Sequence, residues 1–186
     1  MKELEEDMSL SKLILSELEE APREFGKFLT AVPASAWDFK PRDWGGCPGE
    51  TFSLREHLCH VRDFDTLGYQ DRFRRTREEE APVLPSLDGY VMARERGYAE
   101  TDPNEALAAY AAARAQTLAI IRGFAPAELA RPADFAEYGR VTLGGLVHYL
   151  SAHDRQHLAC LHWLLGKHAD ATRRQFSQNQ PEIRPC

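Results

Sequence analysis

The sequence predicts an all-α protein, a four-helix bundle whose helices are joined by long connections. Residues 9–32, 53–76, 102–122 and 142–165 repeat apolar side chains at steps of three and four, the spacing of one helix face. No segment shows a convincing strand alternation. A chain of 186 residues, 43% of them hydrophobic, suits a single core. We therefore expect one domain over residues 1–186, with its core over about 9–166 and a tail over 167–186.

Charge and hydropathy argue against two classes of partner. The formal net charge is -6, and no expected helix carries a basic face, so nucleic acid is not an expected partner. No apolar run approaches the roughly 20 residues that span a bilayer, and the N-terminus, MKELEEDMSLSK, is acidic. The four cysteines form no CxxC motif, and free thiols fit a reducing compartment. We expect a cytoplasmic protein without membrane contact, whose exposed loop aromatics are compatible with a homodimer.

The first two helices and their connection have local signals. Pro22 lies inside the first helical segment, where proline loses a backbone hydrogen bond, so we expect a kink or two abutting helices. Residues 33–52 contain prolines, glycines and two tryptophans, which predicts an irregular connection whose aromatics pack on the bundle. Loops of this length in compact domains are often functional. Ser53 and Glu56 form a capping box that starts the second helix.

The second half of the chain contains two further helices. Asp102 is an N-cap for an alanine-rich helix that ends at Gly123. Residues 130–141 are expected to be extended or looped. Thr142 can cap the last helix, which we expect to stop at Gly166. The tail beyond it has no periodicity, so we expect it to be poorly ordered.

The histidines of the last helix fall into two kinds. At about 100° per residue, His153 and His157 lie within the apolar arc, whereas His148 and His162 lie on the opposite side and should face solvent. Buried imidazoles cost free energy unless their nitrogens find partners. A divalent metal would satisfy both, and the i, i+4 spacing can place two histidines on one ion. The alternative is that each hydrogen-bonds a side chain or carbonyl across the bundle.

The second helix offers a third ligand. His57 and His60 both lie on or beside its apolar arc, and either would complete three protein ligands with a fourth position open. Spacing alone does not choose between them, although for His57 we favour a supporting or core role. Asp63, one turn beyond His60, is a candidate base or orienting group, or else part of a charged face. His168, beyond the expected helix stop, should lie on the surface.

Two other residues lie near the same arc of the last helix. Cys160 is a candidate soft ligand or nucleophile, although a buried cysteine is more often a small core residue. Asp154 should pair with a basic group, such as Arg62 or another arginine.

Three segments carry a resemblance to a known family. FSLREHLCHVRDFDTLGYQDRFRR, ARERGYAETDPNEALAAYAAARAQTLAIIRGF and GRVTLGGLVHYLSAHDRQHLACLHWLL together resemble the DinB-like superfamily of four-helix-bundle metalloproteins, over about residues 10–166 and in the family's order. The resemblance implies one metal-binding histidine on the second helix, which HLCHVRD places on His60. It also implies a HxxxH pair, which HDRQH places on His153 and His157. Cys160 stands where many relatives carry glutamine.

The resemblance also implies an activity. Family members of known activity use a thiol such as bacillithiol, mycothiol or glutathione, whose pKa the metal lowers. We therefore expect a divalent metal, zinc or nickel, on the three histidines, and transfer of a low-molecular-weight thiol to a small electrophile. Asp63 or a nearby polar group would manage protons. The alternatives are a metal-dependent hydrolase that uses metal-bound water and a non-catalytic metal-binding or interaction bundle.

Overall fold

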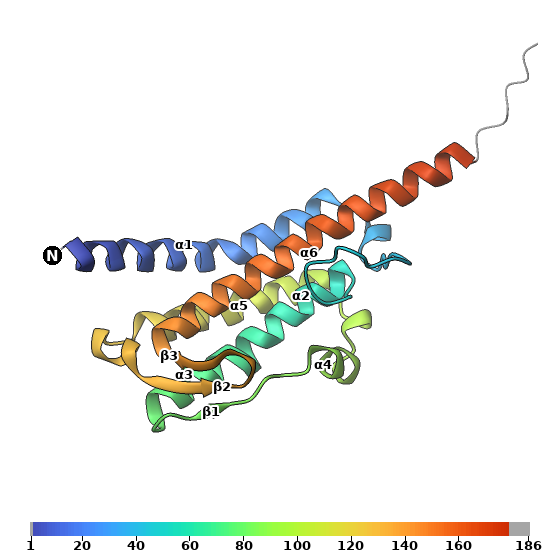
Figure 1. The fold of residues 1–186 in the computed structure, drawn as a ribbon. Helices are drawn as coiled ribbons and strands as arrows, with labels where there is room; N and C mark the ends of the chain where they lie inside the picture. The colour runs from blue at the N-terminus through green and yellow to red at the C-terminus, as the bar shows by residue number, and fades with distance from the viewer. Residues whose placement is uncertain (1, 179–186) are drawn as a thin grey trace, which may run out of the picture.

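The computed structural model describes residues 2–178, which form a mostly helical protein (Figure 1). Long helices run side by side: α1 (Lys2–Ala31) packs on α5 (Pro103–Arg122) and α6 (Leu143–Gln178), and α2 (Leu54–Asp63) also packs on both α5 and α6. This arrangement confirms the predicted all-α class. α3 (Gln70–Glu78) continues the helical stretch that α2 begins, so α1, α2 with α3, α5 and α6 are the four long helical segments of the bundle.

The second helical stretch is continuous but contains a π-helical segment. The Ser53 hydroxyl accepts the Glu56 N–H at 3.3 Å, and the Glu56 carboxylate accepts the Ser53 N–H at 2.7 Å, which confirms the predicted capping box. After α2, the π-helix η2 (Phe64–Tyr69) leads into α3 without a break. It carries Phe64, which stacks on the His60 ring. Segments of this kind are frequent at functional sites.

The first helix excludes one of the two arrangements expected at Pro22. α1 begins at Lys2, earlier than predicted, and runs through Pro22 to Ala31 as one helix, so two abutting helices are not formed. A proline lacks the N–H that would bond the carbonyl four residues earlier, which here is that of Leu18. Arg114 of α5 donates to this carbonyl at 3.2 Å. A tertiary hydrogen bond therefore replaces the local one that the proline removes.

The last helix corrects a second expectation. Thr142 accepts the Gly145 N–H at 3.0 Å, as predicted for a cap. However, α6 passes through Gly166 and continues to Gln178, so the predicted stop and poorly ordered tail are wrong for residues 167–178. Residues 179–186 lie outside the described part of the chain. Glycine inside a helix costs about 1 kcal/mol but does not by itself end it.

Aromatic contacts support this extension of α6. Trp44, from the connection after α1, stacks on Trp163 with ring centroids 5.5 Å apart. Phe39 meets the ring of His168 edge-to-face at 5.1 Å. His168 therefore lies half-buried within the helix and not past its end. The same contacts confirm that aromatics of this connection pack on the bundle.

Short elements fill the connections. Asp102 caps α5 by accepting the N–H groups of Asn104 and Glu105. Where we expected an extended or looped segment, β2 (Pro132–Phe135) pairs antiparallel with β3 (Gly139–Thr142), and β1 (Val83–Leu84) adds parallel to β2. These strands are too short for an alternating pattern to reveal them. The remaining elements are η1 (Ala34–Ala36), α4 (Gly89–Glu95), η3 (Tyr98–Glu100), η4 (Pro126–Ala130) and η5 (Ala136–Tyr138).

A buried charge cluster ties three helical elements together. Arg114 of α5 donates to Asp65 of η2 and to Asp154 of α6, each at 2.6 Å, and all three side chains are buried. The partner of Asp154 is thus an arginine, as expected, but Arg114 and not Arg62. Buried ion pairs are costly to break because they leave an uncompensated charge behind. The cluster therefore fixes the rotation of α6, on which Asp154 directly follows His153.

Between residues 2 and 178, none of the helices combines the length and the apolar content that crossing a membrane requires. Cys47, Cys59 and Cys160 are free thiols.

Candidate metal centre

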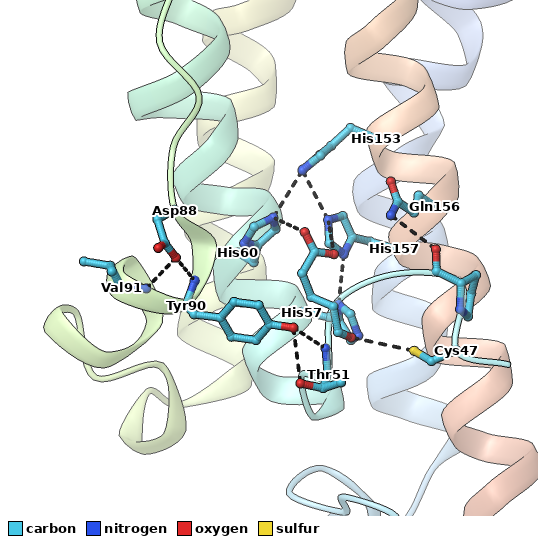
Figure 2. A network of polar contacts seen from close by, with 12 residues as sticks. Cys47, Thr51, His57, His60, Asp88, Tyr90, Val91, His153, Gln156 and His157 are labelled. Atoms are coloured by element: carbon cyan, nitrogen blue, oxygen red, sulfur yellow. Dashed lines mark hydrogen bonds and ion pairs between the residues drawn. The ribbon is translucent and has the colours of Figure 1, made fainter. Parts of the chain in front are cut away.

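Three histidines from two helices converge at the centre of the bundle. Figure 2 shows His60 projecting from α2 toward His153 and His157 of α6. The Nε2 atom of His153 lies 3.2 Å from Nε2 of His60 and 3.2 Å from Nε2 of His157. We call these residues the histidine trio. His148 and His162, on the opposite side of α6, are exposed as predicted.

Hydrogen bonds among the three imidazoles do not satisfy all of the ring nitrogens that meet here. A neutral imidazole has one N–H and one lone pair on its two ring nitrogens. Nε2 of His153 therefore offers either one proton or one lone pair to two neighbouring nitrogens. A cation about 2.1 Å from each nitrogen would use all three lone pairs, and a 3.2 Å separation then corresponds to an N–metal–N angle of about 100°. This angle lies between the tetrahedral and octahedral values, so the trio fits a divalent ion such as zinc or nickel.

Burial keeps the trio in its neutral form. Burial lowers the pKa of His60 to about 3, although the charge of Asp63 acts to raise it. The pKa values of His153 and His157 are also well below 6.5, because of burial and the neighbouring histidines. Metal ions bind the deprotonated imidazole, so the histidines are in the ligating form at neutral pH.

His57 contacts the ring nitrogen of His157 that points away from the other two histidines of the trio. Its Nδ1 atom lies 2.9 Å from Nδ1 of His157, and its side chain is fully buried. With Nε2 of His157 turned toward the trio, the His157 Nδ1–H can donate to His57. Such a contact fixes the tautomer and the ring orientation of a metal ligand. The contact agrees with the supporting role that we favoured for His57.

Cys160 lies beside this supporting contact. The ligand atoms of His57, His157 and Cys160 are within 4.8 Å of one another, which makes them a second possible metal-binding group. Burial raises the pKa of Cys160 to about 12, and the neighbouring Cys47 adds to the shift. The Cys160 thiol is therefore protonated at neutral pH, as expected for a small buried core residue.

Glu50 is a site residue that the sequence did not single out. Its Oε1 atom is 4.0 Å from Nε2 of His60, and its Oε2 atom is 3.9 Å from Nε2 of His157. Oε2 is buried and has no hydrogen-bond partner in the described chain. The carboxylate thus faces the trio at a distance longer than a direct hydrogen bond.

A tight loop brings Glu50 to the histidines. A Cβ atom on Gly49 would lie 2.8 Å from Nε2 of Gln156 and 2.9 Å from Sγ of Cys160, so only glycine lets the loop lie this close to α6. Gln156 also donates to the Pro48 carbonyl at 3.3 Å (Figure 2). The glycine–proline pattern of this loop was the available signal, but it did not distinguish Glu50 from the other acidic residues in the connection.

The start of α4 covers the other side of the trio. Asp88 caps α4 by accepting the N–H groups of Tyr90 and Val91 (Figure 2). A Cβ atom on Gly89 would lie only 2.7 Å from Cε1 of His60, so the backbone closes directly over this imidazole. The Tyr90 hydroxyl accepts the N–H of Thr51 at 3.0 Å and so links α4 to the loop that carries Glu50.

Asp63 faces arginines instead of the histidine trio. Its two carboxylate oxygens accept from Arg62 at 2.7 and 3.0 Å, and Arg96 donates to one of them. Burial acts to raise the pKa of Asp63, but Arg62, Tyr98 and Arg96 hold it below its ordinary value. Both oxygens are engaged in these ion pairs, so this geometry lends no support to the predicted catalytic role, and we assign no proton transfer to Asp63.

Comparison with known proteins places the fold in a family. The structure matches that of YfiT from Bacillus subtilis, described as "a probable metal-dependent hydrolase with an unusual four-helix bundle topology". The TM-score is 0.73 at 20% identity, over 85% of this chain and 87% of that chain, which confirms the predicted four-helix-bundle fold. No curated protein matches the sequence. The family model of the DinB superfamily matches residues 17–161, and the chain therefore belongs to the DinB superfamily.

Proposed function

We propose that the protein is a metal-dependent enzyme whose histidine trio holds a divalent ion, zinc or nickel. The observation that carries the proposal is the convergence of three Nε2 atoms, with two separations of 3.2 Å, from the fully buried His60 and His157 and the partly buried His153. When bound, such an ion lowers the pKa of a water or thiol and polarises an electrophile. The likeness in fold to YfiT, described as a probable metal-dependent hydrolase, supports the same class of chemistry.

The remaining site residues have separate tasks in this proposal. Glu50, the carboxylate nearest to the trio, accepts the proton of the attacking water or thiol. His57 holds the imidazole of His157 in place. The Gly49 loop and the start of α4 close over the imidazoles and keep bulk water out. An adjacent cavity of about 370 Å³, whose wall includes His153 and Glu50, receives the electrophile.

Two reactions fit these roles. Transfer of a low-molecular-weight thiol to a small electrophile is our first candidate, because the family resemblance implies it. Hydrolysis is the second candidate, and Glu50 favours it. A metal lowers the pKa of water only to about 7, so a water nucleophile gains from a neighbouring base, whereas a thiol starts from a pKa near 8.5 and needs less help.

Metal content tests the first step of the proposal. Protein purified without added metal, stripped with a chelator and then dialysed against zinc should bind one ion per chain. His153→Ala should remove most of this binding, whereas the matched variant His148→Ala, at an exposed position of the same helix, should retain it. Equal zinc content in His153→Ala and the unmodified protein would refute the assignment.

Product analysis then separates the two reactions. With the zinc or nickel form, an electrophile and a thiol, formation of a thiol adduct supports transfer, and turnover without any thiol supports hydrolysis. Glu50→Gln keeps the shape of the side chain but removes the base, so it should slow hydrolysis by about 10²–10⁴-fold. A form with full metal content and neither activity would contradict the enzymatic proposal.

A further inference from the structure

Arg72 is a buried cation that has no anionic partner among the side chains that the structure describes. Its side chain on α3 is 4% exposed, and its one hydrogen bond within residues 2–178 goes to the Pro85 carbonyl at 3.4 Å. No ion pair joins it to an acidic side chain that the structure describes, and the adjacent Asp71 pairs with Arg74. An unpaired buried charge is costly, which makes this arginine unusual.

Aromatic rings hold the guanidinium in place. Its Cζ atom lies 4.4 Å from the ring centroid of Phe135, 4.9 Å from that of Tyr69 and 5.9 Å from that of Phe64. Cation–π contacts offset part of the desolvation cost, but they engage the faces of the guanidinium. Apart from Nη2, which donates to the Pro85 carbonyl, the N–H groups along its edge are available to bind a planar anion. The rings therefore fix the position of an anion-binding group before any ligand arrives.

The same cavity joins Arg72 to the histidine trio. Arg72, Glu50 and His153 all belong to the wall of the cavity of about 370 Å³. Phe64 bridges the two regions, since its ring contacts the guanidinium and also stacks on the His153 ring at 5.0 Å. This volume is at the low end of the roughly 300–1,000 Å³ typical of ligand pockets, so it suits a small molecule.

We propose that Arg72 binds an anionic group, a carboxylate or a phosphate, on the small substrate whose reacting part lies at the histidine trio. The inference rests on the proposed function, because it names the class of substrate for that site. A bidentate contact with the guanidinium would orient the substrate. Glu50, the carboxylate in the cavity wall, would repel the same anion and so direct it toward Arg72.

Small aromatic probes test this assignment. We would titrate the metal-free protein with benzoate, phenyl phosphate and neutral benzamide, and follow the Nε–H signals of ¹⁵N-labelled arginines. At least one of the anions should bind about tenfold or more tightly than benzamide and shift the Arg72 signal. Tighter binding of benzoate would indicate a carboxylate on the substrate, and tighter binding of phenyl phosphate would indicate a phosphate. Equal binding of all three probes would overturn the proposal.

Variants exclude indirect effects. Arg72→Met should abolish the preference for anions, Arg72→Lys should retain part of it, and Arg74→Met, at an exposed position of the same helix, should leave it unchanged. Arg72→Met should also require at least as much urea to unfold, because it removes an unpaired buried charge. An undiminished preference for anions in Arg72→Met would refute the role of Arg72.

Zinc titrations distinguish a failure of this inference from a failure of the proposed function. Zinc should bind Arg72→Met as tightly as the unmodified protein, since Arg72 is not part of the histidine trio. Failure of the unmodified protein to bind zinc, together with a preserved anion preference, would reject the metal function and leave the anion site standing. Normal zinc binding without an anion preference would reject the anion site alone.

Discussion

Mild acid should destabilise the metal-free protein, because the histidines at the centre of the bundle are buried in their neutral form. Burial lowers the pKa values of His57 and His60 to about 3, and those of His153 and His157 shift in the same direction. In the unfolded chain each imidazole returns to a pKa of about 6.5 and takes up a proton in acid. The stabilisation is thus fully present above about pH 6.5 and is lost as the pH falls from there toward about 3.

The size of the loss follows from these values. A histidine whose pKa is about 6.5 in the unfolded state and about 3 in the folded state contributes about 1.4 kcal/mol less at pH 5.5 than at pH 7.5. His57 and His60 together should therefore remove about 3 kcal/mol, and His153 and His157 add to it. Domains of this size are typically stable by about 5–15 kcal/mol, so the change is readily measured.

Urea unfolding of the chelator-stripped protein at pH 7.5, 6.5 and 5.5 measures this loss. His57→Phe removes one of the buried imidazoles and should reduce the loss by about 1.4 kcal/mol. His148→Gln, at an exposed position of α6, should leave the pH dependence as it is in the unmodified protein. A free energy of unfolding that changes by less than about 1 kcal/mol between pH 7.5 and 5.5 would refute the buried, neutral state of these histidines.

Three further predictions concern single contacts. Arg114→Met leaves two buried carboxylates unpaired and should cost about 3–5 kcal/mol in urea unfolding, whereas Arg122→Met, at an exposed ion pair, should cost less than about 1 kcal/mol. Gly89→Ala would place a Cβ atom 2.7 Å from His60, so zinc affinity, measured by competition with a coloured chelator, should fall; full affinity would contradict this close packing. His57→Phe removes the acceptor of a ligand histidine and should weaken zinc binding by about 10–100-fold in the same titration; unchanged binding would show that the contact is not needed.

Local signals in the sequence predicted much of the helical framework. The caps at Ser53, Asp102 and Thr142 act within a few residues, and the structure forms each of them. At Pro22 and Gly166 the helices continue because tertiary contacts outweigh the local preference, which made the predicted stop at Gly166 wrong. Arg114 replaces the hydrogen bond that Pro22 removes, and the packing of Phe39 on His168 supports α6 beyond Gly166.

The site was predictable only in part. Helical rotation placed His153 and His157 on the inner face of α6, and the structure brings them together. The spacing of His57 and His60 puts both on one face, so only the resemblance, and then the fold, distinguished the residue that faces the trio from the one behind it.

Residues whose role depends on the path of the chain could not be predicted from periodicity. Glu50 reaches the trio because the loop at Gly49 lies flush against α6, a contact that no local pattern specifies. Arg72 lies in a helix with several arginines, and only the fold reveals that no described acidic side chain pairs with it.

The most direct test of the central claim is a crystal structure of the zinc-loaded protein with an anomalous difference map at the zinc edge. We expect one strong peak about 2.1 Å from the Nε2 atoms of His60, His153 and His157, with a water or a small molecule at a further coordination position. A peak between His57, His157 and Cys160 would contradict the assignment of the ligands. A peak at the trio closed by Glu50 as a fourth protein ligand, with no open position, would contradict the catalytic role and indicate a structural metal site.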